Sequence, residues 1–342
     1  MRIIHVVTAL RGGGLERIVV ELVRHAIASG HQAHVICLSE APVGPIELDH
    51  SEYTILPRMA PISMLAPISL ARKLRRLSPD VAHLHSGVWF KAAYASHLAG
   101  VRAIVLTDHG RLPPDRFSKR CFDGMGVCMA HRVVAVSSPL AEYLRTHLRV
   151  SRAKLSVIPN GIRRSPQPSA SELMEVRREL KILPSDLVIG SVGRLHPIKG
   201  YDHLLDAFAE LKLQAIGRNS GLVLVLVGDG EERARLERQA EALGLTRSIR
   251  FVGHREDARR LLSVMDLFVQ PSKSEGTSLA LLEAMAAGVA VVATAVGGTP
   301  DALGPSATDQ LVEPGDQAGM VRAIGALLRD PERRRMVGQA GR

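Results

Sequence analysis

The stretch LFVQPSKSEGTSLALLEAMAAGVAVVATAVGG, residues 267–298, joins a short apolar run, a polar loop, an apolar helical segment and a second apolar run. The runs at 267–269 and 289–293 predict strands, and the segment between them predicts a helix that begins near Ser278. Apolar residues occupy both faces of these strands, as a parallel sheet covered by helices requires. This stretch therefore predicts one β-α-β unit of an α/β sheet.

The same alternation of strand and helix runs through the rest of the chain. Strands are predicted at 3–7, 33–38, 81–84, 103–106 and 132–136 in the first half, and at 187–192, 222–227 and 249–252 in the second. A chain of 342 residues is longer than one core usually supports. We expect two doubly wound Rossmann-like domains that face each other across a cleft. Residues 1–162 form the first, 187–342 form the second, and 163–186, with the Pro- and Ser-rich run 165–171, link them.

Composition narrows the classes of function. Apolar residues make up 46% and charged residues 23% of the chain, as in ordinary globular proteins. Lys and Arg outnumber Asp and Glu by 44 to 34, which favours contact with phosphates, nucleic acid or an anionic membrane surface. Aromatic residues make up only 3%, which argues against single-stranded nucleic acid, because its bases usually stack on aromatic side chains. Phosphate-bearing small molecules and membranes remain.

The expected location is the cytoplasm. Cys37, Cys121 and Cys128 have spacings that match neither a disulfide framework nor a zinc site. The longest apolar region contains Glu283, so no membrane span is predicted. In the segment 70–77, LARKLRRL, leucines form one helical face and basic residues the other. That pattern is compatible with peripheral docking on the inner face of the membrane, but we favour a core helix with a solvated basic face.

Two carboxylates in the opening stretch are the strongest candidates for ligand binding. Glu275 lies in the polar loop, and Gly276, Thr277 and Ser278 supply the small and capping residues that begin the helix. Such a helix start binds phosphate through its free amides. Glu283 lies eight residues further on, about 10 Å along a helix. A sugar nucleotide, with hydroxyls at both ends and phosphates between them, fits this spacing, although a neighbouring Arg could also satisfy a buried Glu283.

A second element, GSVGRLHPIKG at 190–200, places Arg194 and Lys199 directly after a predicted strand. Two cations beside a diphosphate would neutralise it and stabilise the charge that develops on a leaving group. The spacing of a Walker loop is absent. No two aspartates stand two residues apart, the pair with which many sugar transferases hold a divalent ion. We therefore predict no cofactor and no metal requirement.

The first half contributes weaker candidates. Gly12, Gly13 and Gly14 follow the first strand and allow the backbone to approach a phosphate, but the G-x-G-x-x-G spacing fails. His85 and His109 both follow buried strands. We favour a functional role for His109, because Gly110 beside it suggests a tight loop near a ligand. For His85, structural and functional interpretations are equally good.

Six ordered motifs together resemble the retaining glycosyltransferase family 4, whose members have the GT-B fold. They are GGGLER at 12–17, TDHG at 107–110, VIPNGI at 157–162, GRLHPIKG at 193–200, VGDGEER at 227–233 and the E-x7-E pair at 275 and 283. The resemblance covers nearly the whole chain. It implies a metal-independent hexosyltransferase that moves a sugar from a nucleotide-diphosphate donor to a glycan or lipid-linked acceptor, in cell-surface polysaccharide or glycolipid biosynthesis.

The resemblance also implies roles for single residues. Arg194 and Lys199 would contact the donor diphosphate, Glu275 the hydroxyls of the transferred sugar, and Glu283 the ribose. His109 would lie beside the sugar and phosphates. Gly13 and Gly14 would permit close approach from the first domain, which would bind the acceptor while the second binds the donor.

Two departures from the family pattern stand out. Arg163 replaces an aspartate that commonly follows NGI in the family. Related enzymes continue beyond the position of Arg342 into a helix that crosses back to the first domain, so the resemblance implies a short version. Two alternatives to a transferase remain: a sugar-nucleotide epimerase on the same fold, and a catalytically weak subunit that binds sugar nucleotides.

Overall fold

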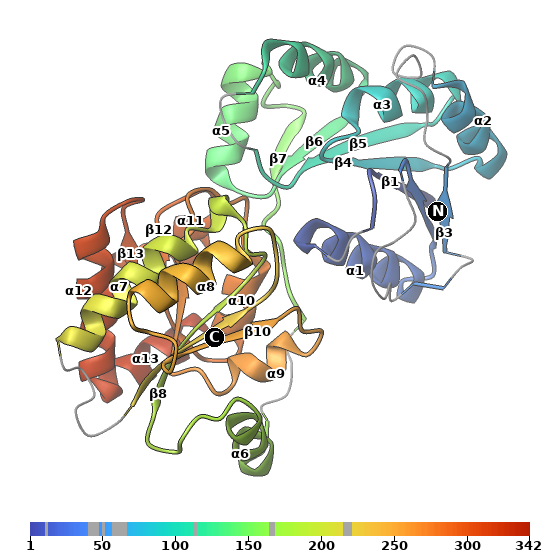
Figure 1. Ribbon diagram of the computed structural model, residues 1–342. Coiled ribbons are helices and arrows are strands. Elements are labelled where there is room, and N and C mark those ends of the chain that lie inside the picture. Colours follow the sequence, from blue (N-terminus) through green and yellow to red (C-terminus); the bar gives the residue numbers. More distant parts are fainter. Residues whose placement is uncertain are drawn as a thin grey trace. The chain divides into compact units, whose positions relative to one another are not determined.

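A computed structural model describes residues 1–10, 13–39, 48–49, 52–56, 67–111, 115–163, 168–214 and 221–342. The chain divides into two compact units, Met1–Asn160 and Gly161–Arg342. Each unit is a parallel β-sheet with helices on both faces (Figure 1). Each unit therefore has the doubly wound α/β architecture that the sequence predicts.

Unit 1 contains a seven-stranded sheet in the order β3-β2-β1-β4-β5-β6-β7. Its strands are β1 (Arg2–Val7), β2 (Gln32–Cys37), β3 (Tyr53–Ile55), β4 (Val81–His85), β5 (Ala103–Asp108), β6 (Arg132–Ala135) and β7 (Leu155–Val157). The strand order reverses between β1 and β4. Ligands of open α/β sheets bind beyond the carboxyl ends of the strands at such a reversal.

The two faces of this sheet are covered by different helices (Figure 1). The helices are α1 (Gly14–Ala28), α2 (Ile68–Leu77), α3 (Trp89–Leu98), α4 (Phe117–Met129) and α5 (Ser138–His147). One face packs Val7 and Val35 against Val19 and Val23 of α1. The other face buries Ile4 and its neighbours in a larger core with residues of α2 to α5. Side chains alternate between these cores along each strand, because successive residues of a strand point to opposite faces.

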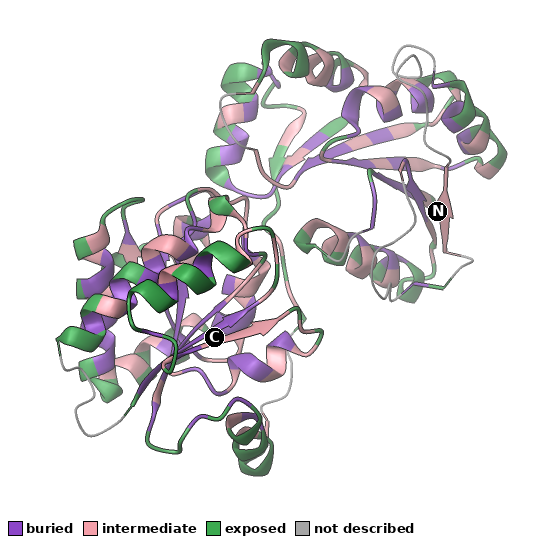
Figure 2. Ribbon diagram, in the orientation of Figure 1, coloured by how far each residue is buried: buried purple, intermediate pink, exposed green. Residues whose placement is uncertain are grey.

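Unit 2 contains a six-stranded sheet in the order β10-β9-β8-β11-β12-β13, which reverses between β8 and β11. Its strands are β8 (Leu187–Val192), β9 (Leu222–Val227), β10 (Ile249–Gly253), β11 (Leu267–Gln270), β12 (Ala290–Thr294) and β13 (Leu311–Val312). Every side chain of β9, β11 and β12 is buried (Figure 2). These strands form the most strongly apolar layer of the unit.

Helices cover both faces of this sheet as well. They are α6 (Ala170–Glu179), α7 (Tyr201–Leu213), α8 (Arg233–Ala242), α9 (Ala258–Leu262), α10 (Leu279–Ala286), α11 (Thr299–Leu303), α12 (Gln317–Arg329) and α13 (Pro331–Gly341). Residues of α7, α8 and α12 share one core with the sheet. Residues of α6, α9 and α10 share the other. The helix that the sequence predicts after Ser278 is α10, with the Ser278 hydroxyl accepting a hydrogen bond from the Leu281 amide.

The predicted linker, 163–186, contains a helix. Helix α6 begins at a capping box in which Ser169 and Glu172 exchange side-chain and backbone hydrogen bonds. Its Val176 is fully buried in the core of unit 2. Residues 164–167, which include the first three residues of the Pro- and Ser-rich run, lie outside the described residues. The described division of the chain falls after Asn160, so α6 belongs to unit 2 rather than to a free connection.

Helix α2 contains the basic segment 70–77. Leu70 and Leu74 are fully buried, whereas Arg72, Arg75 and Arg76 are exposed. The structure thus confirms the favoured interpretation, a core helix with a basic outer face, because its leucines are already packed inside unit 1.

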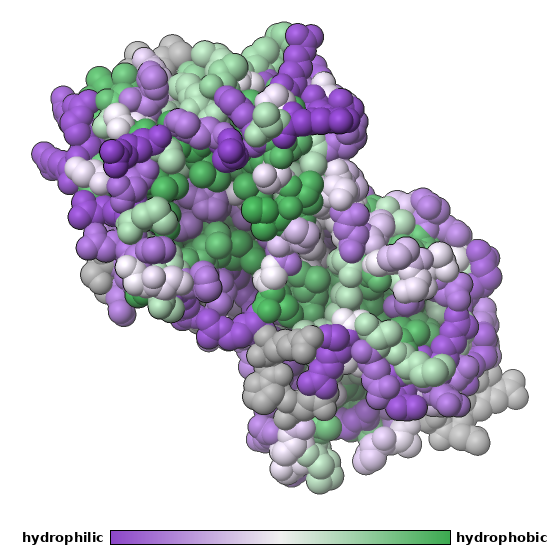
Figure 3. Space-filling view, turned by 180° about the vertical axis from the view of Figure 1, so that it is seen from behind, coloured by the Kyte–Doolittle hydropathy of each residue, from purple (hydrophilic) through white to green (hydrophobic). Residues whose placement is uncertain are grey.

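A space-filling view shows hydrophilic side chains over much of the outer surface, with apolar residues gathered between them (Figure 3). In the described part of the chain, no helix combines the length and apolarity needed to cross a membrane.

Candidate functional site

Lys199 and Glu275 lie together where the sheet of unit 2 reverses its order. Lys199 ends the short 3-10 helix η2 (Pro197–Lys199) after β8, and Glu275 lies in the loop after β11. The Lys199 Nζ donates to Glu275 Oε1 at 2.5 Å, and the Ser272 hydroxyl donates to the same oxygen at 2.6 Å. The Glu275 side chain is only 9% exposed. The carboxylate is therefore held in one orientation, which reduces the cost of positioning it against a ligand.

Backbone contacts fix the loops that carry this pair. The Lys273 amide donates to the Ile198 carbonyl at 2.7 Å, which ties the loop after β11 to the loop after β8. Gly200 has a φ of +66°, and a Cβ there would overlap the Pro271 carbonyl. Gly297, with a φ of +53°, approaches the Glu275 carbonyl in the same way. Only glycine combines these conformations with such close packing.

The start of α10 supplies backbone donors beside Glu275. Gly276 and Thr277 precede the N-cap residue, Ser278, and the three residues are partly or fully buried. The Gly298 amide donates to the Gly276 carbonyl at 2.6 Å. The polarity of a helix start favours an anion. The sequence prediction of a capped helix start directly after Glu275 is confirmed, whereas its contact with phosphate stays a prediction.

Arg194 and Tyr201 flank Lys199 on the chain. Arg194 is exposed in the loop after β8 and, among the described residues, forms no ion pair. Tyr201 begins α7 and is 3% exposed. Burial raises the pKa of Tyr201, and the charge of Glu275 nearby raises it further. Arg194 is thus an exposed cation near the paired cation Lys199 on the chain. The sequence analysis missed Tyr201, whose position at a helix start is its only signal.

Glu283 is buried in α10 and is paired with an arginine. Its side chain is 2% exposed, and Arg259 of α9 donates through Nε to Glu283 Oε1 at 2.9 Å. The prediction of a buried carboxylate is confirmed, and Arg259 is the neighbouring arginine that the sequence analysis allowed as a partner. The contact of Glu283 with a ribose stays a prediction.

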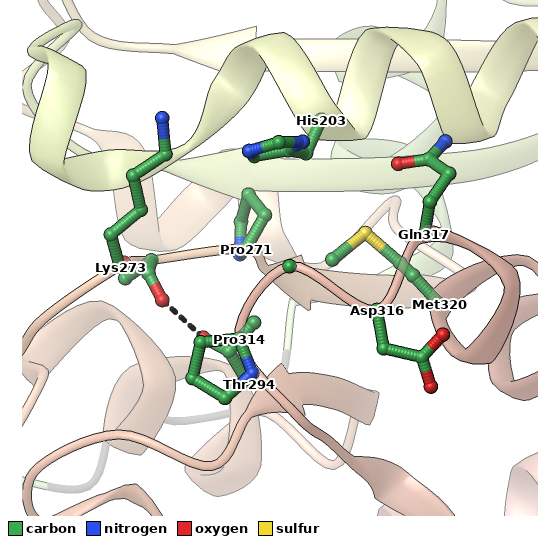
Figure 4. Close-up of a pocket in the computed structure, with 10 residues that line it drawn as sticks. His203, Pro271, Lys273, Thr294, Pro314, Asp316, Gln317 and Met320 are labelled. Carbon is green, nitrogen blue, oxygen red and sulfur yellow. Dashed lines mark hydrogen bonds between the residues drawn. The ribbon is translucent and has the colours of Figure 1, made fainter.

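A small pocket adjoins the same loop. It is lined by residues of the loop after β11, by Thr294 at the end of β12 and by residues around the start of α12. Figure 4 shows Lys273, His203 and Gln317 at its rim, and a hydrogen bond that runs from the Thr294 hydroxyl to the Ser272 carbonyl. The pocket shares Ser272 with the Glu275 contact. It therefore extends the polar region around the loop after β11.

In unit 1, Gly13 and Gly14 stand at the start of α1, after β1. Gly13 is the N-cap residue and is extended, and a Cβ there would meet the Glu16 carboxylate. Gly12 lies outside the described residues. The described glycines thus sit at a helix start beyond a strand next to the order reversal, as predicted, and their approach to a phosphate stays a prediction.

His109 follows β5 in unit 1, and its ring joins two others. His85 Nδ1 lies 2.9 Å from His109 Nε2, and His85 Nε2 lies 3.1 Å from His5 Nδ1. Burial lowers the pKa of His5 to about 4. Burial lowers the pKa of His109 to about 4 as well, with the Asp108 charge opposing the shift. Burial and the neighbouring rings also lower the pKa of His85, so these rings are neutral at pH 7.

The acidic residue before His109 organises its loop. Asp108 accepts from the Ser86 hydroxyl at 3.1 Å, and the Ser86 oxygen accepts from the His109 amide at 2.8 Å. Asp108 also pairs with Arg111, which contacts two further carboxylates and lies over the Trp89 ring. Opposite charges raise the pKa of Arg111 against the effect of burial. Arg111 thus fixes the loop of His109, a role the sequence analysis missed.

Comparisons with known proteins agree with this fold. The family model described as Glycosyltransferase Family 4 matches residues 12–165, and the model described as Glycosyl transferases group 1 matches residues 174–342. The 2-deoxystreptamine N-acetyl-D-glucosaminyltransferase of Streptomyces fradiae is 30% identical over 85% of this chain and 73% of its own length. A GDP-mannose-dependent phosphatidylinositol monomannoside mannosyltransferase of Mycolicibacterium smegmatis is 31% identical over 82% of this chain and 76% of its own.

Solved structures show the same fold. The crystal structure of Anabaena HepE in complex with UDP-glucose superposes with a TM-score of 0.83, covers all of this chain and 93% of its own, and is 24% identical. The fold is GT-B, and the two family models identify a glycosyltransferase that uses nucleotide sugars. This chain belongs to glycosyltransferase family 4, the retaining enzymes of that class.

Proposed function

We propose that this chain transfers a hexosyl group from a nucleotide-diphosphate sugar to a glycan or lipid-linked acceptor. Glu275 binds hydroxyls of the transferred sugar, Lys199 and Arg194 bind the diphosphate, and Glu283 binds the ribose. Gly276, Thr277 and Ser278 offer backbone donors to the phosphates. The single observation that carries the proposal is the Lys199–Glu275 contact at 2.5 Å, because it joins a hydroxyl-binding carboxylate to a phosphate-binding cation.

The charges of these groups suit the reaction. The bond from the sugar C1 to the phosphate oxygen breaks, and a bond from C1 to the acceptor oxygen forms on the same face of the ring. The leaving phosphate takes the acceptor proton and gains negative charge as it departs. Lys199 and Arg194 stabilise that charge, which is the step at which a positioned cation contributes most. We therefore propose that no divalent metal is required.

Substrate classes are proposed from the relatives. The Streptomyces fradiae relative is named as an N-acetylglucosaminyltransferase, and the Mycolicibacterium relative uses GDP-mannose. HepE was crystallised with UDP-glucose. We propose a UDP-sugar or GDP-sugar donor and an acceptor from cell-surface polysaccharide or glycolipid synthesis. The exposed arginines of α2 favour an electrostatic contact with an anionic membrane at the cytoplasmic face.

The acceptor belongs to unit 1 in this proposal. Gly13 and Gly14 let the acceptor-side backbone come close to the donor phosphates, and His109 lies beside the sugar. Trp89 is 2% exposed and Arg111 lies over its ring. We therefore propose neither Trp89 nor Arg111 as an acceptor contact. We therefore propose that polar groups at the ends of β1, β4 and β5 contact the acceptor.

The test is an assay of the full chain with UDP-, GDP- and ADP-sugars, with and without candidate acceptors. We expect one donor class to raise the melting temperature and to release nucleoside diphosphate faster when an acceptor is present. Added EDTA should leave the rate unchanged. Conversion of the donor to an isomeric sugar nucleotide would establish an epimerase instead. Binding without turnover for any acceptor would favour the subunit interpretation.

A variant pair links the assay to the site. Glu275→Ala removes the sugar-binding carboxylate, and we expect donor binding and turnover both to fall. Glu241→Ala changes an exposed residue of α8 and serves as the matched control, with donor binding and turnover unchanged. Wild-type donor binding and turnover in Glu275→Ala would contradict the proposed site.

A further inference from the structure

The sheet of unit 1 carries histidines where a parallel sheet usually carries aliphatic residues. His5 on β1 and His83 on β4 are partners in the strand register, and His85 lies two residues further along β4. Register places all three on one face of the sheet. His5 is 2% exposed and His85 is fully buried. Polar rings at these positions require partners, because burial without a hydrogen bond costs free energy.

Two ring-to-ring hydrogen bonds run in series through this group. One joins His5 Nδ1 to His85 Nε2 at 3.1 Å, and the next joins His85 Nδ1 to His109 Nε2 at 2.9 Å. Both nitrogens of His85 are used. His109 Nδ1, at the end of the series, is buried and has no partner among the described residues. The series therefore leads from the interior of the sheet to one unpaired ring nitrogen at the end of β5.

Neutral rings give this series only two arrangements. A neutral imidazole has one N–H and one acceptor nitrogen, so each hydrogen bond needs a proton from one side only. If His5 Nδ1 donates to His85, then His85 donates from Nδ1, and His109 also carries its proton on Nδ1. If His109 donates from Nε2, the other two rings carry their protons on Nε2 as well. All three rings must share one tautomer.

We propose that His5 and His85 are positioning residues that set the tautomer of His109 through this series, here called the three-ring series. In the Nδ1–H arrangement, His109 offers a donor to a phosphate or sugar oxygen, and in the Nε2–H arrangement it offers an acceptor to a hydroxyl. Exchange of the two arrangements moves one proton across each hydrogen bond, releases one proton at one end of the series and takes up one proton at the other. Every ring stays neutral.

The ligand that selects the arrangement follows from the proposed function, on which this part of the inference rests. A diphosphate oxygen beside His109 is an acceptor only. It therefore favours the donor form of His109 Nδ1, and the other two rings follow. Burial of the series away from water keeps the rings neutral, so the diphosphate meets an N–H dipole rather than a full charge.

His83 lies in the same cluster but outside the series. Its Nε2 lies 2.7 Å from the Thr107 hydroxyl, and burial lowers its pKa too. One ring nitrogen of each of His5, His83 and His85 lies within 4.8 Å of the other two, a grouping that could hold a metal ion. Both ring nitrogens of His85 are used in the three-ring series, so a metal bound to His85 would displace one of its two ring hydrogen bonds. The two interpretations therefore exclude each other.

The direct test is nitrogen-15 NMR of the full chain labelled at histidine, with signals assigned by His5→Gln, His85→Gln and His109→Gln. We expect the three rings to share one tautomer in the free protein. We expect saturation with UDP, or with GDP or ADP if the melting temperature shows that one of these binds instead, to leave all three as Nδ1–H. Unlike tautomers in the free protein would overturn the proposal.

Other outcomes distinguish a failure of the proposed donor site from a failure of the three-ring series. If no nucleoside diphosphate binds, the proposed donor site fails, whereas a shared tautomer in the free protein still supports the series. A bound nucleotide that leaves His109 without a proton on Nδ1 overturns the selecting role. A Zn²⁺ titration decides the metal alternative: joint shifts of His5, His83 and His85 with a higher melting temperature would replace the three-ring series with a metal site.

Steady-state kinetics distinguishes a positioning role of His85 from a purely structural one. His85→Leu removes both hydrogen bonds through which His85 sets the tautomer of His109, and we expect kcat for nucleoside diphosphate release to fall about tenfold with KM for the donor unchanged. His83→Leu, on the same strand and face, should keep kcat. Equal losses of kcat in the two variants would assign His85 a structural role only.

Discussion

The two sheets place their polar groups differently although both reverse strand order at the centre. In unit 2 the strands next to the reversal carry no charged or histidine side chains, and the charged pair, Lys199 and Glu275, lies in loops beyond the strand ends. In unit 1 the corresponding strands carry His5 and His85 within the sheet itself. The loops of unit 2 are fixed by backbone contacts, whereas the rings of unit 1 are fixed by one another. The polar groups compared here are therefore a charged pair in the loops of unit 2 and neutral rings within the sheet of unit 1.

The largest expected effect tests the charged pair. Lys199→Ala removes the cation that stabilises the leaving diphosphate, and we expect kcat to fall about 100- to 1,000-fold. Lys212→Ala removes an exposed lysine of α7 and should keep full activity. Steady-state kinetics with the donor identified by the binding screen provides the measurement. A Lys199→Ala enzyme with wild-type kcat would mean that unit 2 does not stabilise the departing charge.

The next effect tests whether backbone packing fixes the loops of unit 2. Gly200→Ala adds a Cβ that overlaps the Pro271 carbonyl at a left-handed φ, and we expect about 3 kcal/mol of lost stability. Gly244→Ala has a φ of +69° but open space around the added Cβ, so its cost should be about 1 kcal/mol. Denaturant unfolding measures both. Equal losses of stability in Gly200→Ala and Gly244→Ala would show that the loops after β8 and β11 tolerate displacement.

The pH dependence of stability tests the neutral rings of unit 1. The pKa of His5 is about 4 in the folded state and about 6.5 in the unfolded state, so the unfolded chain binds more protons between these values. Stability therefore falls as the pH drops from 7 to 5, by about 2 kcal/mol for this residue. The loss of stability between pH 7 and pH 5 should be smaller in His5→Gln by that amount. The same loss in the wild type and in His5→Gln would indicate that folding does not lower the pKa of His5.

A comparable or smaller effect tests the buried carboxylate of unit 2. Arg259→Ala leaves Glu283 without this partner, and we expect a loss of about 2 kcal/mol, below the cost for fully buried pairs because Arg259 is 38% exposed. Arg260→Ala, on the same helix, removes solvent-exposed pairs with Glu175 and Glu179 and should cost about 0.5 kcal/mol. Thermal unfolding with and without donor measures both. If bound donor raises the melting temperature of Arg259→Ala more than that of the wild type, the result would support the proposed ribose contact.

Much of the fold could be predicted from the pattern of apolar runs. The strands at 187–192 and 222–227 match β8 and β9 residue for residue, because long buried strands carry strong signals. Three short strands at or near sheet edges, β3, β7 and β13, were missed. Each has only two or three residues, and half-exposed side chains give no clear alternation. Helix α6 was missed as well, because its flanking Pro and Ser residues suggested a linker.

The candidate site was predictable where chemistry sits in local motifs. The E-x7-E pair, the capped start of α10 and the cations after β8 are each readable in a single short stretch. Contacts between stretches were not readable: Arg259 on Glu283, Arg111 on Asp108, and the ring series through His85. Each of these joins residues whose meeting depends on strand register or helix packing. The proposed ligand roles of the site residues stay predictions.

The sequence by itself determined the α/β class, the two sheets, the family and the position of Glu275 before a capped helix, because these depend on local periodicity and on ordered motifs. Only the tertiary structure decided that Lys199 holds Glu275, since two loops 76 residues apart meet at the strand-order reversal. It also decided that His5, His85 and His109 form one series, because parallel register aligns β1, β4 and β5. Register and packing are set by the whole core, and no short stretch of sequence contains them.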